Sequence, residues 1–522
     1  MNKLPIGIQS FEKLRQERFL YIDKTKYVYD LATNNIPYFL SRPRRFGKSL
    51  LLSTMRAYFE GKKDLFDGLA IEKPEGQKDN PWVQYPVFYF DFNGKNYQVK
   101  GALEEKLDGL LCDWEEKYGT EYHDRPLEDR FKQLLRLAFE KSGKRCVILI
   151  DEYDKPLLDV IEDSDLQQHN KDVFKGFFST LKSEDEFIHF IFITGVTKFH
   201  KVSIFSDLNQ LVDISLNRDY AGICGITEEE IKDYFNAEID ALAKTQGIDK
   251  EECQAILKKK YDGYKFHQDG VNIYNPYSVM NVFFSKEFGS YWFETGTPSF
   301  LVQRVSNSDF DVRKFTDKTL YASESSLKDY TGDSLDLIPL LYQTGYITIS
   351  DYDRRLGRYT LSFPNDEVKY GFLDSLIPEY TPVVKSVNGL DIFTLNESLE
   401  EGNLDKIRDI LKGLFASITY TIKKAPFEHY FQSIMYIVFT LLGKNTRCEM
   451  HTYTGRIDCV VETAKYVYLF EIKRDDSADA ALEQIDSNDY SLPFIADDRI
   501  IYKIGVNFSS ESRMLEEWKV EE

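Results

Sequence analysis

Short apolar runs alternate with amphipathic stretches throughout the first 225 residues, and this alternation constrains the fold more than any other feature. Amphipathic stretches with apolar residues three and four positions apart are typical of helices, and short apolar runs bounded by turns are typical of strands. Strands that alternate with helices favour a parallel sheet with helices on both faces. The expected strands lie at 36–41, 86–92, 146–151 and 187–195.

The rest of the chain is expected to form a helical middle region and a second α/β unit. From Thr227 the pattern is helical, and Thr227 and Glu230 have the spacing of a capping box. Helical segments flank an expected β-hairpin at 346–363, which predicts a winged-helix-like module. The second unit is expected to contain an amphipathic helix at 393–418, a helix at 425–442, strands near 447–453, 457–463 and 467–473, a helix at 478–488 and a strand at 498–506.

Composition and charge narrow the class of protein. No segment approaches the roughly 20 apolar residues that span a bilayer, and the N-terminus lacks the apolar stretch and cleavage site of a signal peptide. The six cysteines are scattered without a Cys-x-x-Cys pair, which argues against a disulfide framework and a zinc site. We therefore expect a soluble cytoplasmic protein. The net charge of −20 argues against a protein that coats nucleic acid through a broad basic surface, although a local basic patch is compatible with it.

A candidate phosphate loop follows the first expected strand, where residues 42–49 read Arg-Pro-Arg-Arg-Phe-Gly-Lys-Ser before a helical pattern. Such a loop needs backbone N–H groups at a helix N-terminus, a lysine for the β- and γ-phosphate oxygens and a hydroxyl for Mg²⁺. Gly47, Lys48 and Ser49 supply the second half of this pattern. Arg42 stands where the usual pattern has its first glycine, so a basic turn that caps a helix is the alternative interpretation.

Two acidic residues, Asp151 and Glu152, end the third expected strand. The unbroken apolar run before them is typical of a strand buried on both faces. Open α/β sheets bind ligands at the carboxyl ends of their strands. There Asp151 would hold the Mg²⁺ shell and Glu152 would polarise an attacking water. The alternative is that both acids begin a surface turn.

These motifs resemble the AAA-ATPase-like proteins of bacteria and archaea, and the resemblance covers roughly residues 1–285. It implies a P-loop NTPase in which Arg-Pro-Arg-Arg-Phe-Gly-Lys-Ser replaces the usual phosphate loop. The matching stretches are at 21–25, 41–55, 147–157, 193–199, 221–231 and 272–283.

The resemblance also implies roles for individual residues. Ser49 and Asp151 would hold the Mg²⁺ that accompanies ATP, and Glu152 would serve catalysis. Thr194 would be a sensor-type polar residue. Any of three arginines could neutralise the charge of the γ-phosphate, and the sequence does not choose among Arg44, Arg45 and Arg218. The expected nucleotide-binding residues are Arg44, Arg45, Phe46, Gly47, Lys48, Ser49 and Asp151.

A second candidate site lies on an expected hairpin near the C-terminus. If the turn is centred between residues 464 and 465, Asp458 lies directly opposite Glu471, with Cβ atoms about 5 Å apart. Lys473 shares the face of Glu471, because it is two residues further along the strand. Two such carboxylates repel unless a cation lies between them, which predicts a Mg²⁺ or Mn²⁺ site with Lys473 orienting or deprotonating a water. A solvated hairpin face, with the repulsion relieved by Lys473, is the alternative.

Together with Glu428 in the preceding helix and Gln484 in the following one, this hairpin resembles the PD-(D/E)XK nuclease superfamily over about residues 420–510. The resemblance implies that Asp458 and Glu471 bind metal, that Lys473 serves the nucleophile, and that Glu428 and Gln484 support the site. Three domains are therefore expected: an AAA-like P-loop ATPase core at 1–225, a helical lid and winged-helix-like region at 226–385, and a restriction-endonuclease-like α/β domain at 386–522.

Two functions follow from this pairing. In the first, an ATP hydrolase regulates metal-dependent cleavage of nucleic acid, with DNA favoured over RNA. In the second, a nucleotide switch has a C-terminal domain that binds nucleic acid or a protein partner without cutting. The expected partners are ATP and nucleic acid, without a membrane, and a homo-oligomer is left open.

Overall fold

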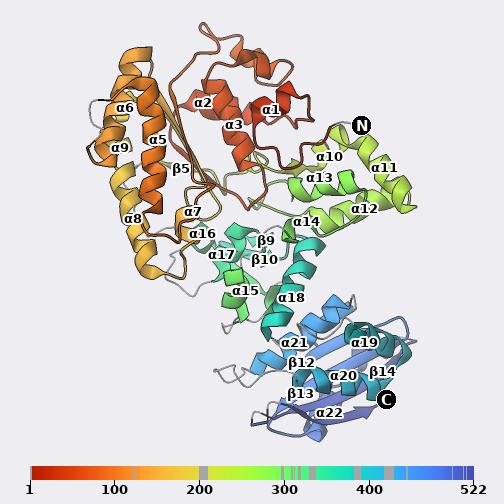
Figure 1. The fold of residues 1–522 in the computed structure, drawn as a ribbon. Helices are drawn as coiled ribbons and strands as arrows, with labels where there is room; N and C mark the ends of the chain where they lie inside the picture. Colours follow the sequence, from red (N-terminus) through yellow and green to blue (C-terminus); the bar gives the residue numbers. More distant parts are fainter. Residues whose placement is uncertain are drawn as a thin grey trace. The chain divides into compact units, whose positions relative to one another are not determined.

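The computed structural model forms two compact units, each drawn in Figure 1. The first unit comprises Met1–Trp292 with Tyr321–Asn365, and the second comprises Phe293–Leu320 with Asp366–Glu522. This division differs from that of the three expected domains. The structure describes residues 3–120, 124–198, 210–294, 299–306, 310, 312–315, 319–328, 337–380, 390–416, 428–442, 445–496, 498–509, 511–512 and 514–522.

The first unit is built on a parallel five-stranded sheet in the order β2-β3-β4-β1-β5. Every residue of β3 is buried, which explains its unbroken apolar run, because a strand covered on both faces has no side that faces water. The predicted parallel sheet is therefore confirmed. Its strands are β1 (Tyr38–Ser41), β2 (Val87–Asp91), β3 (Cys146–Asp151), β4 (Ile188–Gly195) and β5 (Val212–Asp213).

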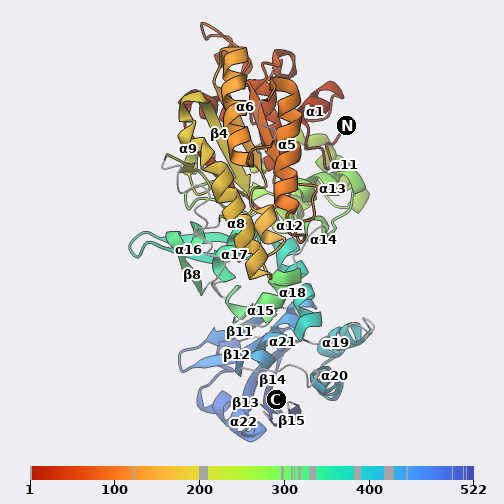
Figure 2. The same cartoon turned by 60° about the vertical axis from the view of Figure 1, so that its left-hand side comes forward.

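Helices cover both faces of this sheet (Figure 1). The ring of Phe90 in β2 contacts Phe131, Phe177 and Phe178 on one face, and Figure 2 shows the helices of that face side by side. The helices of the first 225 residues are α1 (Phe11–Gln16), α2 (Thr25–Asn34), α3 (Lys48–Phe59), α4 (Glu72–Glu75), α5 (Ala102–Tyr118), α6 (Leu127–Ser142), α7 (Lys155–Leu158), α8 (Ser164–Phe178) and α9 (Thr180–Ser183), with 3-10 turns η1 (Lys63–Phe66), η2 (Asp185–Phe187) and η3 (Arg218–Tyr220).

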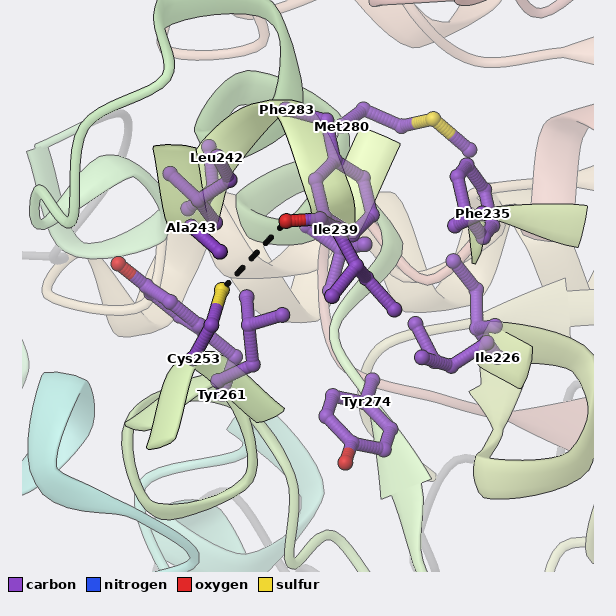
Figure 3. Packing of buried hydrophobic residues seen from close by; sticks show 14 residues of the cluster. Ile226, Phe235, Ile239, Leu242, Ala243, Cys253, Tyr261, Tyr274, Met280 and Phe283 are labelled. Carbon is purple, nitrogen blue, oxygen red and sulfur yellow. Dashed lines mark hydrogen bonds between the residues drawn. The ribbon is translucent and has the colours of Figure 1, made fainter. Parts of the chain in front are cut away.

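A helical region follows the sheet and has its own buried cluster, which includes Phe235, Ile239, Tyr274 and Phe283 (Figure 3). The predicted capping box is present, since the Thr227 hydroxyl accepts from the Glu230 N–H and the Glu230 carboxylate accepts from the Thr227 N–H. The elements are β6 (Ile226–Thr227), α10 (Glu228–Tyr234), α11 (Asn236–Gln246), α12 (Lys250–Tyr261), β7 (Ile273–Tyr274), α13 (Pro276–Ser285) and α14 (Tyr291–Glu294).

The predicted hairpin is also confirmed, since β9 and β10 pair in antiparallel fashion. A third strand extends it to a sheet in the order β8-β10-β9, and short helices precede the hairpin, as expected for a winged-helix-like module. The elements are β8 (Leu320–Ser323), α16 (Glu324–Lys328), α17 (Leu337–Thr344), β9 (Thr348–Asp353) and β10 (Arg358–Ser362).

The second unit contains a mixed five-stranded sheet in the order β11-β12-β13-β14-β15. The predicted succession of a helix, three antiparallel strands, a helix and a strand is confirmed; β14 pairs with β13 in parallel, and β15 is an addition at the edge. The elements are α15 (Ser299–Ser306), η4 (Val312–Phe315), α18 (Asp366–Tyr380), α19 (Leu390–Glu401), α20 (Leu404–Ala416), α21 (Glu428–Leu441), β11 (Asn445–His451), β12 (Arg456–Glu462), β13 (Tyr466–Arg474), α22 (Ala478–Ser487), η6 (Leu492–Phe494), β14 (Ile500–Phe508) and β15 (Leu515–Glu521).

The single amphipathic helix predicted at 393–418 is wrong, because α19 and α20 are separate helices. Gly402 lies between them with a φ of +74°, a left-handed conformation that ends a helix. A Cβ atom at this position would lie 2.6 Å from the Tyr466 ring, so the close approach also requires glycine. Among the helices of the described residues, none is long and apolar enough to cross a membrane.

Candidate functional sites

The candidate phosphate loop lies between the end of β1 and the start of α3. Gly47 caps the helix, Lys48 is its first residue, and the half-buried Ser49 is its second. The buried Lys48 ammonium donates to the carbonyl oxygens of Arg42 at 2.9 Å and Pro43 at 3.0 Å. The loop therefore holds a desolvated cation at the N-terminus of a helix, which is where anions bind.

The two acids that end β3 lie at the same edge of the sheet. Asp151 is 1% exposed, and its carboxylate accepts from the Thr194 hydroxyl at 2.7 Å and the Tyr89 hydroxyl at 3.3 Å. Burial raises the pKa of Glu152, and Lys48 opposes this shift. Because β4 lies between β1 and β3 in the sheet, Thr194 near the end of β4 lies between the strand that precedes the phosphate loop and the strand that ends in the two acids. The burial of Asp151 contradicts the surface-turn alternative.

Asp154 is a buried residue of this edge that the sequence interpretation missed. Its carboxylate accepts from the N–H groups of Val196 and Thr197 and from the Thr197 hydroxyl, at 2.6–3.2 Å. These bonds fix the segment that follows β4. Burial raises the pKa of Asp154, with the Thr197 hydrogen bonds and Lys48 acting in the opposite direction. Its only sequence signal was the run of acids after the apolar strand.

The other predicted nucleotide residues lie in different surroundings. Arg44 and Arg45 are exposed in the loop, and Arg218 is exposed in η3. The Phe46 side chain is buried, so this residue can face a phosphate only through its backbone. Arg42, which the sequence marked only as a missing glycine, is also buried.

The second candidate site lies on β12 and β13. The ladder between these strands pairs Cys459 with Phe470, so Asp458 and Glu471 occupy the next position in register, as the hairpin argument predicts. Asp458 is 7% exposed and Glu471 is 2% exposed. The Asp458 carboxylate accepts from the Ile472 N–H at 2.8 Å. Burial of both acids contradicts the alternative of a solvated hairpin face.

Glu471 lies in an environment that favours its protonated form. Burial, followed by repulsion from Asp458, raises the pKa of Glu471 to about 8, although Lys473 opposes the shift. Its Oε2 atom is buried without a hydrogen-bond partner among the described residues. An orphaned carboxylate oxygen beside a second carboxylate fits a hard divalent cation. No cluster of three or more potential ligand residues occurs in the described ranges.

Lys473 and Gln484 are brought to the same place. The Lys473 ammonium lies 3.4 Å from Glu471 Oε1 and donates to Gln484 Oε1, while Gln484 Nε2 donates to the Tyr490 hydroxyl at 3.3 Å. The buried Tyr490, which the sequence interpretation missed, also accepts from the Arg456 N–H at 3.0 Å. Glu428 begins α21, but its side chain lies outside the described residues.

The raised pKa of Glu471 predicts that metal binding releases protons. At pH 7 a carboxyl group with a pKa of about 8 is mostly protonated, and a metal binds the deprotonated form. We expect Mn²⁺ to displace close to one proton at pH 7 and only a small fraction of one at pH 9. Calorimetric titration in buffers of different ionisation enthalpy measures this number, and Glu471→Gln provides the control without the titrating group. A proton count independent of pH would contradict the expectation.

The same shift sets the pH dependence of the metal-free protein. A glutamate has an ordinary pKa of about 4.3 in an unfolded chain. Because folding raises this value, the unfolded state loses the proton first, and Glu471 reduces stability as the pH rises from about 4 to about 8. Melting curves in EDTA should therefore show Glu471→Gln gaining stability relative to the unaltered protein across this window.

Comparison with known proteins identifies the families of the two domains that carry these candidate sites. Residues 5–205 match the family described as predicted AAA-ATPase, and residues 426–518 match the PD-(D/E)XK nuclease superfamily. An uncharacterized protein in the vnfD 5' region of Azotobacter chroococcum mcd 1 is 35% identical over 534 residues, which covers 99% of both chains. The Aeropyrum pernix ORC2 protein in its ADPNP-ADP complexes is similar over 68% of this chain and 92% of its own, but 10% identity and a TM-score of 0.27 are too low to support an inference. The chain therefore belongs to the AAA-ATPase-like family and has a C-terminal domain of the PD-(D/E)XK nuclease superfamily.

Proposed function

We propose that this protein hydrolyses ATP and that its nucleotide state regulates metal-dependent cleavage of nucleic acid by the C-terminal domain. The observation that carries the proposal is the buried pair Asp458 and Glu471, with an orphaned oxygen on Glu471 and an ammonium 3.4 Å away on Lys473. A buried acid pair costs stability unless a cation compensates it. Two buried carboxylates beside a lysine supply the metal ligands and the proton acceptor that a metal-dependent phosphodiesterase needs.

In the nucleotide site, Lys48 would exchange its bonds to the loop carbonyls for bonds to phosphate oxygens. Ser49 and Asp151 would hold Mg²⁺, which supplies charge neutralisation at the phosphates. Glu152 would accept a hydrogen bond from the attacking water and orient it. Thr194 donates to Asp151 and so fixes the carboxylate in place.

In the C-terminal site, Asp458 and Glu471 would hold Mg²⁺ or Mn²⁺, which stabilises the charge that develops on the phosphorus oxygens. Lys473 would position a water and accept its proton when deprotonated. Attack by this water forms a new P–O bond, the bond to the leaving oxygen breaks, and that oxygen takes up a proton. The Gln484 carbonyl accepts from the Lys473 ammonium and so helps to hold it beside Glu471.

ATP and nucleic acid, DNA before RNA, are the proposed ligands, and the proposed location is the cytoplasm. The cysteines whose state the structure describes are free, as a reducing compartment allows. The net charge of −20 favours one other function, a nucleotide switch that binds nucleic acid or a protein partner without cutting it. Cleavage assays distinguish the two functions.

The deciding experiment incubates the purified protein with circular and linear DNA and with RNA, in Mg²⁺ or Mn²⁺. Each reaction is run without nucleotide, with ATP and with a non-hydrolysable ATP analogue. We expect cleavage that EDTA abolishes and that nucleotide changes at least severalfold. Asp458→Asn removes a proposed ligand, and Asp486→Asn is the matched control, since Asp486 is exposed and pairs with Lys503. Cleavage that survives in Asp458→Asn would contradict the proposal, and no cleavage under any condition would leave the switch as the function.

A further inference from the structure

The phosphate loop at 42–49 is contacted by aromatic residues from the segment between 225 and 292, which follows the sheet in the sequence. We call Tyr264, Phe266, Tyr277 and Trp292 the outer cradle. All four lie in the same compact unit as the loop. The cradle residues contact the side chains of Arg42, Arg45 and Phe46. They also contact the main-chain carbonyl of Arg44.

Arg42 is held by the Phe266 ring of the cradle and by main-chain carbonyls outside the cradle. Its guanidinium is 1% exposed and lies 3.9 Å from the centre of the Phe266 ring. It donates to the carbonyl oxygens of Ser215 at 2.8 Å and Tyr220 at 3.1 Å. A buried cation requires such partners, because a desolvated charge without them is strongly destabilising. Where other phosphate loops have a glycine, this loop has a side chain that anchors it to distant segments.

Phe46 is held by the same group of rings. Its ring meets Tyr264 edge-on at 4.8 Å and Phe266 at 5.7 Å between centroids. The Phe46 carbonyl accepts from the Gly225 N–H at 3.0 Å. The residue directly before Gly47 and Lys48 is therefore fixed at both its side chain and its backbone.

Between these two anchors, the exposed arginines of the loop are also contacted. The Trp292 indole N–H donates to the Arg44 carbonyl at 3.0 Å, and the Arg45 guanidinium lies 4.9 Å from the centre of the Tyr277 ring. The position of the loop backbone decides where its N–H groups and the Lys48 ammonium point. By contacting the loop, the cradle helps to set the positions of the N–H groups and of the Lys48 ammonium that would bind a phosphate group.

We propose that the outer cradle residues are positioning residues for the nucleotide phosphates, and that they replace the missing first glycine of the phosphate loop. The inference rests on the proposed nucleotide site and goes beyond it, since no cradle residue belongs to the motifs that bind phosphate or metal. It follows that changes in the cradle alter ATP affinity, and that Trp292 reports on occupation of the loop.

The test uses Trp292→Phe, which removes the indole donor and retains an aromatic ring. Loss of one hydrogen bond that orders the loop is expected to weaken ATP binding about two- to tenfold. Trp114→Phe is the matched control, because Trp114 packs on Phe88 and Phe90 in the core of the same unit. It should lower the melting temperature without changing ATP affinity. Phe266→Leu, which removes the ring beneath Arg42 and keeps its apolar bulk, should weaken ATP binding as well.

Tryptophan fluorescence gives a readout that a purely structural role would not move. Addition of ATP should change the emission of the unaltered protein and of Trp114→Phe, and this change should be lost in Trp292→Phe. Equal affinity and an equal fluorescence change in Trp292→Phe, together with normal affinity in Phe266→Leu, would overturn the inference while the nucleotide site stands. Absence of ATP binding in the unaltered protein would instead overturn the nucleotide site and the inference with it.

Discussion

Lys48→Ala is expected to lower ATP hydrolysis by roughly 10²- to 10³-fold, the range seen when one preorganised donor to a developing charge is lost. Lys48 is 5% exposed, and its ammonium already donates to two loop carbonyls. Nucleotide binding therefore does not have to remove this charge from water. A phosphate oxygen that replaces these carbonyls meets a preformed cation. Alanine leaves the N-terminus of α3 in place but removes this charge.

The fold of Lys48→Ala is expected to remain intact, because the Arg42 guanidinium and the Phe46 ring anchor the loop through partners other than Lys48. Lys155→Ala is the matched control, since Lys155 lies on α7 directly after the acidic motif and pairs with Asp159 at 3.0 Å. Steady-state phosphate release and a melting curve for both variants make the comparison. Hydrolysis at the normal rate in purified Lys48→Ala would contradict the assignment of the phosphate loop.

Local patterns were enough to predict most of the framework. All residues of β3, and all of β4 except His189, are buried, so both sequences are mostly apolar and predict strands without tertiary information. Asp458 and Glu471 were placed together because the symmetry of a hairpin about its turn fixes the register. The break between α19 and α20 was missed because apolar periodicity continues across Gly402, whose left-handed backbone and close approach to the Tyr466 ring emerged only from the structure.

Residues that act through distant contacts could not be predicted in this way. Arg42 bonds to Ser215, which is 173 positions away, and nothing in the local sequence marks that pairing. Asp154 holds a segment after β4, and Tyr490 meets Arg456 through a contact 34 positions apart. Thr194 and Gln484 were named from the family resemblance, whereas Arg42, Asp154 and Tyr490 emerged only from the fold.

Lys473→Ala is expected to abolish nucleic-acid cleavage, with a loss of at least about a hundredfold, typical for removal of a general acid or base. Metal binding should survive, because Asp458 and Glu471 remain. The variant therefore separates chemistry from coordination: Mn²⁺ titration should still release protons near pH 7 while cleavage is lost. It should also retain ATP hydrolysis, since the phosphate loop lies in the other compact unit.

Lys503→Ala is the matched control for this experiment. Lys503 lies on β14, the strand next to β13, and its side chain is 22% exposed, as is that of Lys473, but it pairs with Asp486 rather than with the buried acids. An equal loss of cleavage in both variants would indicate a general requirement for positive charge on this sheet. A loss of cleavage confined to Lys473→Ala would indicate that the Lys473 ammonium has a specific role beside Glu471. Full cleavage by Lys473→Ala would exclude that role and would leave activation of the water to another group.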